Sequence, residues 1–282
     1  MAKGKWTAFP YADKAFDYSG DKLHKAWPKL HVGDQEPFPD GARVARLLKA
    51  NAKLGKSADA DRIAAKLQDA WRAYHKGDFE EATDAGIALG PIGAVVSCKA
   101  EGIYAANLVA KEAEQLKRFE AVAARAQDAA KSLPDEANCH YFNAFALGRY
   151  SQLISVTKAL AQGIAGRVRE SLDRTLKLAP KHAEAHLALA LYHAEIVAKI
   201  GGLIASLTYG AKASTAEEHL KTALKLIPDM PIAHLEHGNA LLLLYGDKKA
   251  DAAAAAYDRA AKLKPRDAMD ALDAANAKSQ LE

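Results

Sequence analysis

The chain has 282 residues, of which half are apolar and only 7% aromatic, with 18 glycines and 10 prolines. This length is enough for one large domain with a substantial core, and the abundance of alanine, a strong helix former, predicts an all-α protein. The 39 basic and 35 acidic residues are interspersed along the chain, which argues against the concentrated basic surface of a nucleic-acid-binding protein, so we expect no nucleic-acid partner.

The N-terminal segment, MAKGKWTAFPYADKAF, lacks the apolar core and the small-residue cleavage site of a signal peptide. The longest apolar runs, such as 200–207, are too short to span a membrane. We therefore expect a cytoplasmic protein without a membrane span, in which Cys98 and Cys139 are buried thiols. The terminal Leu281-Glu282 resembles a vector-derived remnant, so an additional leader upstream stays open as an alternative.

Two front segments, 22–40 and 66–84, share the pattern W-x3-H-x-G-D-x-E-x3-D, spread over a predicted helix and turn. Before the tryptophan, the two segments also share a leucine, Leu23 and Leu67, and an alanine, Ala26 and Ala70. A catalytic motif would not need these core positions. The match therefore favours a duplicated structural unit over a site used twice. Trp27 and Trp71 are predicted to anchor helix faces.

A Gly-Asp dipeptide follows the first predicted helix in both segments, at 33–34 and at 77–78. We expect the glycine to end the helix in a left-handed conformation and the aspartate to cap the next helix. The prolines of 37–39 fit the first turn of that next helix. His31 and His75 are then structural residues close to the turns, and the motif marks the start of a repeat array.

Four prolines close apolar helical stretches in the rest of the chain: Pro134, Pro180, Pro228 and Pro265. Before each one, residues spaced by four and then three positions form one helical stripe, and the proline ends the helix because it cannot continue the hydrogen-bond ladder. A new helix is predicted after each of the first three prolines. Six residues after these prolines stand three histidines: His140, His186 and His234.

This unit of helix, connection, helix and proline resembles the tetratricopeptide repeat (TPR), and the Gly-Asp-aromatic turn at 77–79 is similar to the turn of that family. The resemblance implies one α-solenoid domain over 1–282, a right-handed superhelix of antiparallel helix pairs. The implied repeats, followed by a closing helix that caps the last repeat, have these approximate bounds: 14–55, 60–90, 91–134, 135–180, 181–228, 229–265 and 266–280.

Two connections, 151–167 and 197–214, make the repeats longer than the standard unit of about 34 residues. Both are apolar, so we expect them to bury their side chains by lengthening the paired helices or by folding over the concave face. Segment 201–226 is also similar in character to the TPR-like T-component proteins of bacterial TRAP transporters. That resemblance implies a hydrophobic pore or groove.

In TPR solenoids the first helix of each unit lines the concave surface, so the resemblance implies a mostly apolar binding trough with a few charges. Its candidate lining residues, three from each of four repeats, are Leu67, Trp71, Tyr74, Tyr141, Phe145, Arg149, Leu187, Leu191, Glu195, Leu235, Asn239 and Leu242. Candidate polar contacts are His140, His186 and His234, although a packed structural histidine is the preferred interpretation.

No pattern in the chain indicates catalysis or a resident cofactor, because zinc-protease, nucleophile-elbow, Walker, dinucleotide and CxxC motifs are all absent from the sequence. His182 and His186 stand four residues apart, which can place two imidazoles on one helix face, but no further ligand stands at a matching distance. We therefore expect no metal site. An enzyme hypothesis would begin with acidic residues such as Glu184 and Glu195.

We expect a non-catalytic scaffold that binds a protein or peptide segment through its concave face. The alternative is a carrier of an apolar small molecule, with a pocket closed by 197–214. An enzyme is the third hypothesis, and a homo-oligomer stays open. A scaffold is expected to have an open groove, whereas a carrier is expected to have an enclosed apolar cavity.

Overall fold

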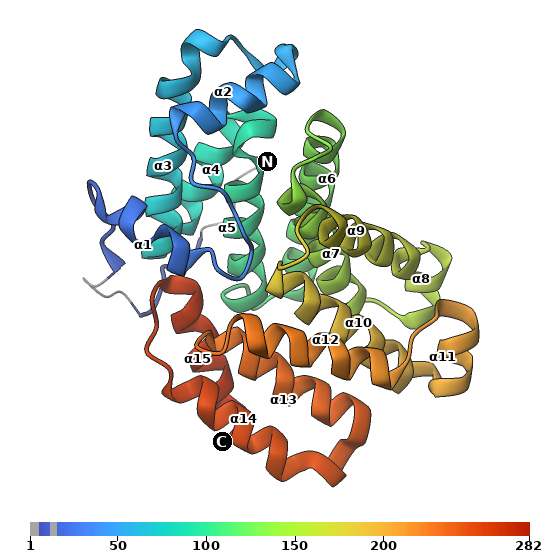
Figure 1. The fold of residues 1–282 in the computed structure, drawn as a ribbon. Helices are drawn as coiled ribbons and strands as arrows, with labels where there is room; N and C mark the ends of the chain where they lie inside the picture. The colour runs from blue at the N-terminus through green and yellow to red at the C-terminus, as the bar shows by residue number, and fades with distance from the viewer. Residues whose placement is uncertain (1–5, 12–15) are drawn as a thin grey trace.

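Helices form all of the regular secondary structure in the described part of the computed structural model, residues 6–11 and 16–282 (Figure 1), which confirms the all-α prediction. The first half contains α1 (Lys22–Leu30), α2 (Gly41–Ala50), α3 (Ala60–Lys76), α4 (Phe79–Ala88), α5 (Ala94–Asn107) and α6 (Glu112–Ser132). The second half contains α7 (Ala137–Gln152), α8 (Val156–Ala161), α9 (Ile164–Leu178), α10 (Ala183–Ile200), α11 (Gly202–Tyr209), α12 (Ala213–Leu226), α13 (Pro231–Tyr245), α14 (Ala250–Lys262) and α15 (Ala268–Ser279).

From α3 to α7, each helix packs against the next one in the chain. After α7 the short helices α8 and α11 are left out of this pattern, so that α7 packs against α9 and α10 packs against α12. The helices α6, α9, α12 and α14 end two or three residues before the four prolines, as predicted. In α12 the predicted stripe of Ala216, Leu220 and Ala223 is its buried set. Spacing along the sequence therefore determines both where these helices end and which face they bury.

Gly77 ends α3 in the left-handed conformation, with φ of 98°, and its N–H donates to the Ala73 carbonyl at 3.1 Å. A Cβ at this position would also meet the Phe9 ring at 2.5 Å, so glycine is required here for two reasons. Asp78 stands at the N-cap of α4, but its side chain makes no capping bond and instead pairs with Lys76 at 3.0 Å.

For Gly33 and Asp34, the prediction of a left-handed glycine followed directly by a capped helix is wrong. Gly33 has no positive φ, and α2 begins only at Gly41, where the Asp40 side chain accepts from the N–H of Arg43. The prolines of 37–39 therefore precede the helix and are not part of its first turn. The physical reason is that the Asp34 carboxylate is held in the protein core, as described below.

Segment 31–36, called the buried turn from here on, links the first turns of α7 and α10. The N–H of Glu184 in α10 donates to the carbonyl of Gly33 at 3.1 Å, and Nδ2 of Asn138 in α7 donates to the carbonyl of Asp34 at 3.0 Å. The buried turn thus gives an acceptor to one of the N–H groups that a helix start leaves without an intrahelical partner.

An ionic cluster at the buried turn joins four parts of the chain. Lys99 in α5 donates to Asp34 at 2.5 Å and to Glu184 at 3.2 Å, and all three side chains are almost fully buried. His31 Nδ1 lies 2.9 Å from Asp34, and its Nε2 lies 3.3 Å from Nε2 of His75 in α3. Burial alone would raise the pKa of Asp34, but His31 and Lys99 outweigh it and hold that pKa well below its usual range.

The closing helix α15 packs on α13 and α14 and also contacts α3, so the end of the helical array meets its front (Figure 1). Asp267 caps α15, and its Oδ2 lies 2.7 Å from Nδ1 of His75. The hydroxyl of Tyr74 donates to the Met269 sulfur at 3.1 Å. The predicted closing helix is therefore more than a cap on the last repeat, because it covers the front repeat as well.

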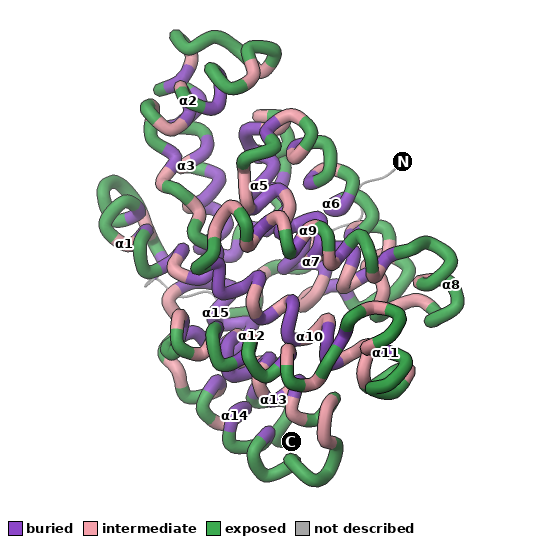
Figure 2. The backbone as a smooth tube through the Cα atoms, turned by 45° about the vertical axis from the view of Figure 1, so that its right-hand side comes forward, coloured by how far each residue is buried: buried purple, intermediate pink, exposed green. Residues whose placement is uncertain are grey.

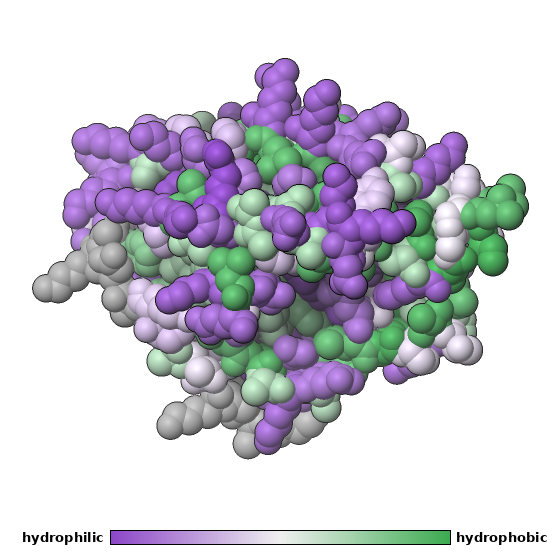
Figure 3. Space-filling model, turned by 90° about the horizontal axis from the view of Figure 1, so that it is seen from below, coloured by the Kyte–Doolittle hydropathy of each residue, from purple (hydrophilic) through white to green (hydrophobic). Residues whose placement is uncertain are grey.

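The two apolar connections form α8 and α11, whose residues are mostly exposed, whereas the residues of α5, α7 and α15 are mostly buried (Figure 2). The expectation that these connections bury their side chains is wrong for their outer faces. Leu203 and Leu207 in α11 are 76% and 79% exposed, and Leu160 in α8 is 50% exposed. In the view from below, apolar side chains gather at the right-hand edge, the side on which α11 lies (Figure 3).

We predict that replacing Lys99 by Met lowers the free energy of unfolding by about 3–5 kcal/mol, because Asp34 and Glu184 would then be buried without their shared cation. Urea unfolding measures this loss. The matched control is Lys262→Met, which removes an exposed lysine paired with Asp258 and is expected to change stability by less than about 1 kcal/mol. Equal losses in the two variants would contradict a stabilising role for the cluster.

Candidate functional site

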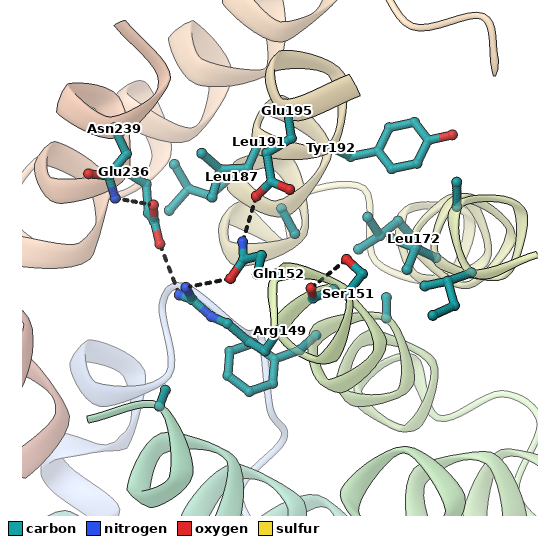
Figure 4. Close-up of a pocket in the computed structure, with 18 of the residues that line it drawn as sticks. Arg149, Ser151, Gln152, Leu172, Leu187, Leu191, Tyr192, Glu195, Glu236 and Asn239 are labelled. Atoms are coloured by element: carbon teal, nitrogen blue, oxygen red, sulfur yellow. Dashed lines mark hydrogen bonds and ion pairs between the residues drawn. The ribbon is translucent and has the colours of Figure 1, made fainter. Parts of the chain in front are cut away.

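A pocket of about 280 Å³ lies between the second-half helices, with α5 and α15 at one end. Its walls are mainly apolar and include Phe142 and Phe145 from α7, Leu172 from α9, and Leu187 and Leu191 from α10 (Figure 4). Helices α10 and α13 carry apolar residues on nearly every face. One apolar face of each helix can therefore pack in the core while another lines the pocket. Clefts with mainly apolar walls and volumes of roughly 300–1,000 Å³ are typical small-molecule sites.

The structure brings eight of the predicted concave-face residues to this pocket: Tyr141, Phe145, Arg149, Leu187, Leu191, Glu195, Leu235 and Asn239. They come from three helices, α7, α10 and α13.

The other four predicted residues do not line the pocket. Leu242 is 38% exposed near the end of α13. Leu67, Trp71 and Tyr74 are buried in the core, where Trp71 packs edge-to-face against Trp27 with ring centroids 5.4 Å apart. They lie in the core because the buried turn and α15 cover this part of α3, and repeat spacing carries no information on that contact.

A chain of polar side chains crosses one side of the pocket and joins α13, α7 and α10 (Figure 4). Asn239 donates to Glu236 at 2.8 Å, and Arg149 donates to Glu236 at 3.2 Å and to Gln152 at 3.4 Å. Gln152 then donates to Glu195 at 2.5 Å. Each charged group of this chain thus has a partner within the protein, and the chain fixes the spacing of three pocket helices.

At the inner end of the pocket, Lys99 and Glu184 of the ionic cluster contribute to the lining together with Asp273 of α15. Asp273 is 4% exposed, and its Oδ2 has no hydrogen-bond partner among the described residues. Burial, followed by the nearby carboxylates of Asp270 and Glu236, raises the pKa of Asp273 well above its usual range.

Sequence reasoning missed Lys99, Asp273 and Glu236. A signal for Lys99 was available, since it is a charged residue inside the apolar stretch AVVSCKAEGIYAA. For Asp273 the signal was weaker: Met269, Asp273 and Asn276 are spaced by four and three positions, which places them on one face of a helix. That face could not be assigned to a pocket without the position of α15.

The outer end of the pocket is lined by the inserted segments. Val156 and Leu160 come from α8, Ile200 from the end of α10, and Tyr209 from α11. The two long connections thus add walls to the pocket, whereas the most exposed leucines of α11, Leu203 and Leu207, are not among its lining residues.

The three candidate polar histidines lie outside the pocket and share one structural role. Nε2 of each bonds the carbonyl of the proline six residues earlier, at 2.9 Å for His140, 3.2 Å for His186 and 2.8 Å for His234. Within 6–11 and 16–282, no group of three or more His, Cys, Asp or Glu side chains is arranged to hold a metal ion.

His182 also has a structural role, at the start of α10. Its Nδ1 accepts from the N–H of Ala185 at 3.0 Å, and its Nε2 lies 2.8 Å from Oδ1 of Asn138. Both contacts suit a neutral imidazole, and burial lowers the pKa of His182 to about 3.

The two acidic residues from which an enzyme hypothesis would start, Glu184 and Glu195, both line the pocket. Each is bonded within the protein, since Glu184 accepts from Lys99 at 3.2 Å and Glu195 accepts from Gln152 at 2.5 Å.

No known family profile matches this chain, and no curated protein matches it significantly. Among the helices of the described residues, none combines the length and the hydropathy that a membrane crossing requires.

We predict that His31 and His182 each make the free energy of unfolding fall as the pH is lowered from 7 to 5, whereas Glu36, whose pKa burial raises to about 8, acts in the opposite direction. Burial lowers the pKa of His31 to about 4 and that of His182 to about 3, against 6.5 for the unfolded chain. Between pH 6.5 and about 4 the unfolded chain therefore holds protons that the folded chain does not. The loss at pH 5 is about 2 kcal/mol for each histidine.

Urea unfolding of the His182→Gln variant at both pH values checks this prediction. Between pH 7 and pH 5 the variant is expected to lose about 2 kcal/mol less of its free energy of unfolding than the parent protein, because one of the destabilising groups is gone. The same substitution at the exposed His24 is the control and leaves the difference unchanged. An unchanged difference in the His182 variant would contradict the prediction.

Proposed function

We propose that the protein is a non-catalytic carrier that binds an apolar or amphipathic small molecule in this pocket. The observation that carries the proposal is a half-open pocket of about 280 Å³ with mainly apolar walls, to which three repeats, α15 and both inserted connections contribute. A peptide-binding groove would be longer and open along the array. Here the contact between α15 and α3 brings the two ends of the array together.

The repeat pattern supports a TPR-like, right-handed solenoid as the scaffold of this carrier, with 197–214 closing one end of the pocket. Cys98 and Cys139 are buried free thiols, and burial raises the pKa of Cys98 to about 12. Unpaired thiols of this kind support a reducing, cytoplasmic location.

A second candidate function is the protein scaffold, and the exposed apolar side chains of α8 and α11 support it. Five apolar side chains of these helices are each 45% or more exposed: Val156, Leu160, Leu203, Ile204 and Leu207. The two helices lie near each other in both backbone views (Figures 1 and 2), and exposed apolar side chains gathered in this way are typical of a contact with a protein or a membrane.

We predict that Gly148→Leu abolishes ligand binding without unfolding the protein. A Cβ at Gly148 would meet no atom within 4 Å, and this helical glycine lines the pocket, so a leucine side chain would fill the space that a ligand uses. Replacing glycine inside a helix is expected to raise stability by up to about 1 kcal/mol. The measurement is fluorescence of the neutral probe N-phenylnaphthylamine, which is expected to increase with the parent protein and not with the variant.

The matched control is Gly202→Leu, because Gly202 also faces open space but does not line the pocket. It is expected to bind the probe like the parent protein. Native mass spectrometry of freshly purified parent protein should in addition show a co-purified small molecule that Gly148→Leu lacks. Equal probe binding by all three proteins would refute the pocket as the binding site.

For the second candidate, we predict that a Leu203→Ser, Leu207→Ser double variant loses retention of a partner in a pull-down from the native organism. Both side chains are more than three-quarters exposed, so melting should change little. Retention that persists in the double variant would show that the surface of α11 is not the contact site.

A further inference from the structure

One face of α15 reaches the pocket through Met269, Asp273 and Asn276. Asp273 is 4% exposed, and its Oδ2 accepts no hydrogen bond from the described residues. A buried carboxylate oxygen without a donor is costly, and native proteins rarely leave one in place without a role. Asp273 lines the pocket, so a ligand whose head group reaches this carboxylate there can supply the missing donor.

The neighbouring carboxylates differ from Asp273 because each has a basic partner. These pairs are Glu236 with Arg149 at 3.2 Å, Asp270 with Arg266 at 2.5 Å, and Asp267 with His75 at 2.7 Å. Asp34 and Glu184 share Lys99. Among the carboxylates at this end of the pocket in the described chain, Asp273 is the one without a basic side chain as its partner. At the inner end of the pocket, Asp273 therefore has no cation of its own.

We propose that the pocket takes an amphipathic amine, whose ammonium group pairs with Asp273 and whose apolar part lies along the walls formed by Phe145, Leu187 and Leu191. This inference rests on the proposed function and names the chemical class of its ligand. An ammonium group carries the missing charge and donates hydrogen bonds, and the apolar walls favour a hydrocarbon body over a small hydrated ion.

Two other ligand classes fit the inner end less well. An anionic head group would need a cation there, but Lys99 already bonds two carboxylates, at 2.5 and 3.2 Å. A metal ion would need several ligands, and the described residues form no such group. The raised pKa of Asp273 is consistent with a carboxylate whose counter-charge arrives with a ligand, because burial and nearby carboxylates alone disfavour its ionised form.

The test is displacement of N-phenylnaphthylamine from the parent protein by octylammonium, octanol and octanoate, which share one hydrocarbon chain and differ in the head group. Octylammonium is expected to displace the probe at a concentration about tenfold lower than octanol, as one charge-assisted hydrogen bond implies. In the Asp273→Asn variant, the two are expected to act within about twofold of each other. The control Asp258→Asn, at an exposed position in α14, keeps the preference of the parent.

The outcomes separate the two proposals. If the neutral probe does not bind the parent protein, the proposed function fails and this inference fails with it. If the probe binds but octylammonium acts no better than octanol or octanoate, the carrier function stands and the amine inference is overturned. A preference that survives in Asp273→Asn also overturns it. The three-way comparison uses the parent protein, so it decides the matter even if the variant folds poorly.

Discussion

The buried ammonium group of Lys99 is the constraint on which the rest of the structure depends. A charge at this depth is tolerated only when it is paired, and its partners, Asp34 and Glu184, are separated by 150 residues in the chain. Satisfying it fixes α5, the buried turn and the start of α10 relative to one another. His31 and His75 extend the same cluster to α3, and Asp267 extends it to α15.

The pocket follows from this arrangement. Helices α7, α10 and α13 present apolar side chains toward the space beside the cluster, and α15 closes one side of it because Asp267 and Met269 hold this helix against α3. The inner end of the pocket therefore holds buried charged groups, and α8 and α11 add apolar side chains at the outer end. The polar chain from Asn239 to Glu195 keeps the three helices at a fixed spacing.

Local chemistry explains which predictions succeeded. Helix ends at prolines, the left-handed Gly77 and the stripe of α12 depend on residues within one or two turns, so the sequence contains their causes. Gly33-Asp34 repeats the letters of Gly77-Asp78 and still folds differently. The difference lies in Lys99 and Asn138, which bind the Asp34 side chain and carbonyl from α5 and α7. The residues of α7, α10 and α13 that repeat spacing groups together mostly line the pocket, whereas those of α3 lie in the core, where the buried turn, Trp27 and α15 cover them.

The sequence by itself determined the helical class, the helix ends and the apolar faces, because these follow from spacing and from backbone chemistry over a few residues. Only the tertiary structure decided that the end of the chain returns to its front, that leucines of α11 stay exposed, and that Asp273 lies unpartnered in a pocket. These features depend on which distant charges and apolar faces meet. A single buried lysine can be satisfied by many carboxylates, and only folding selects the two that it bonds.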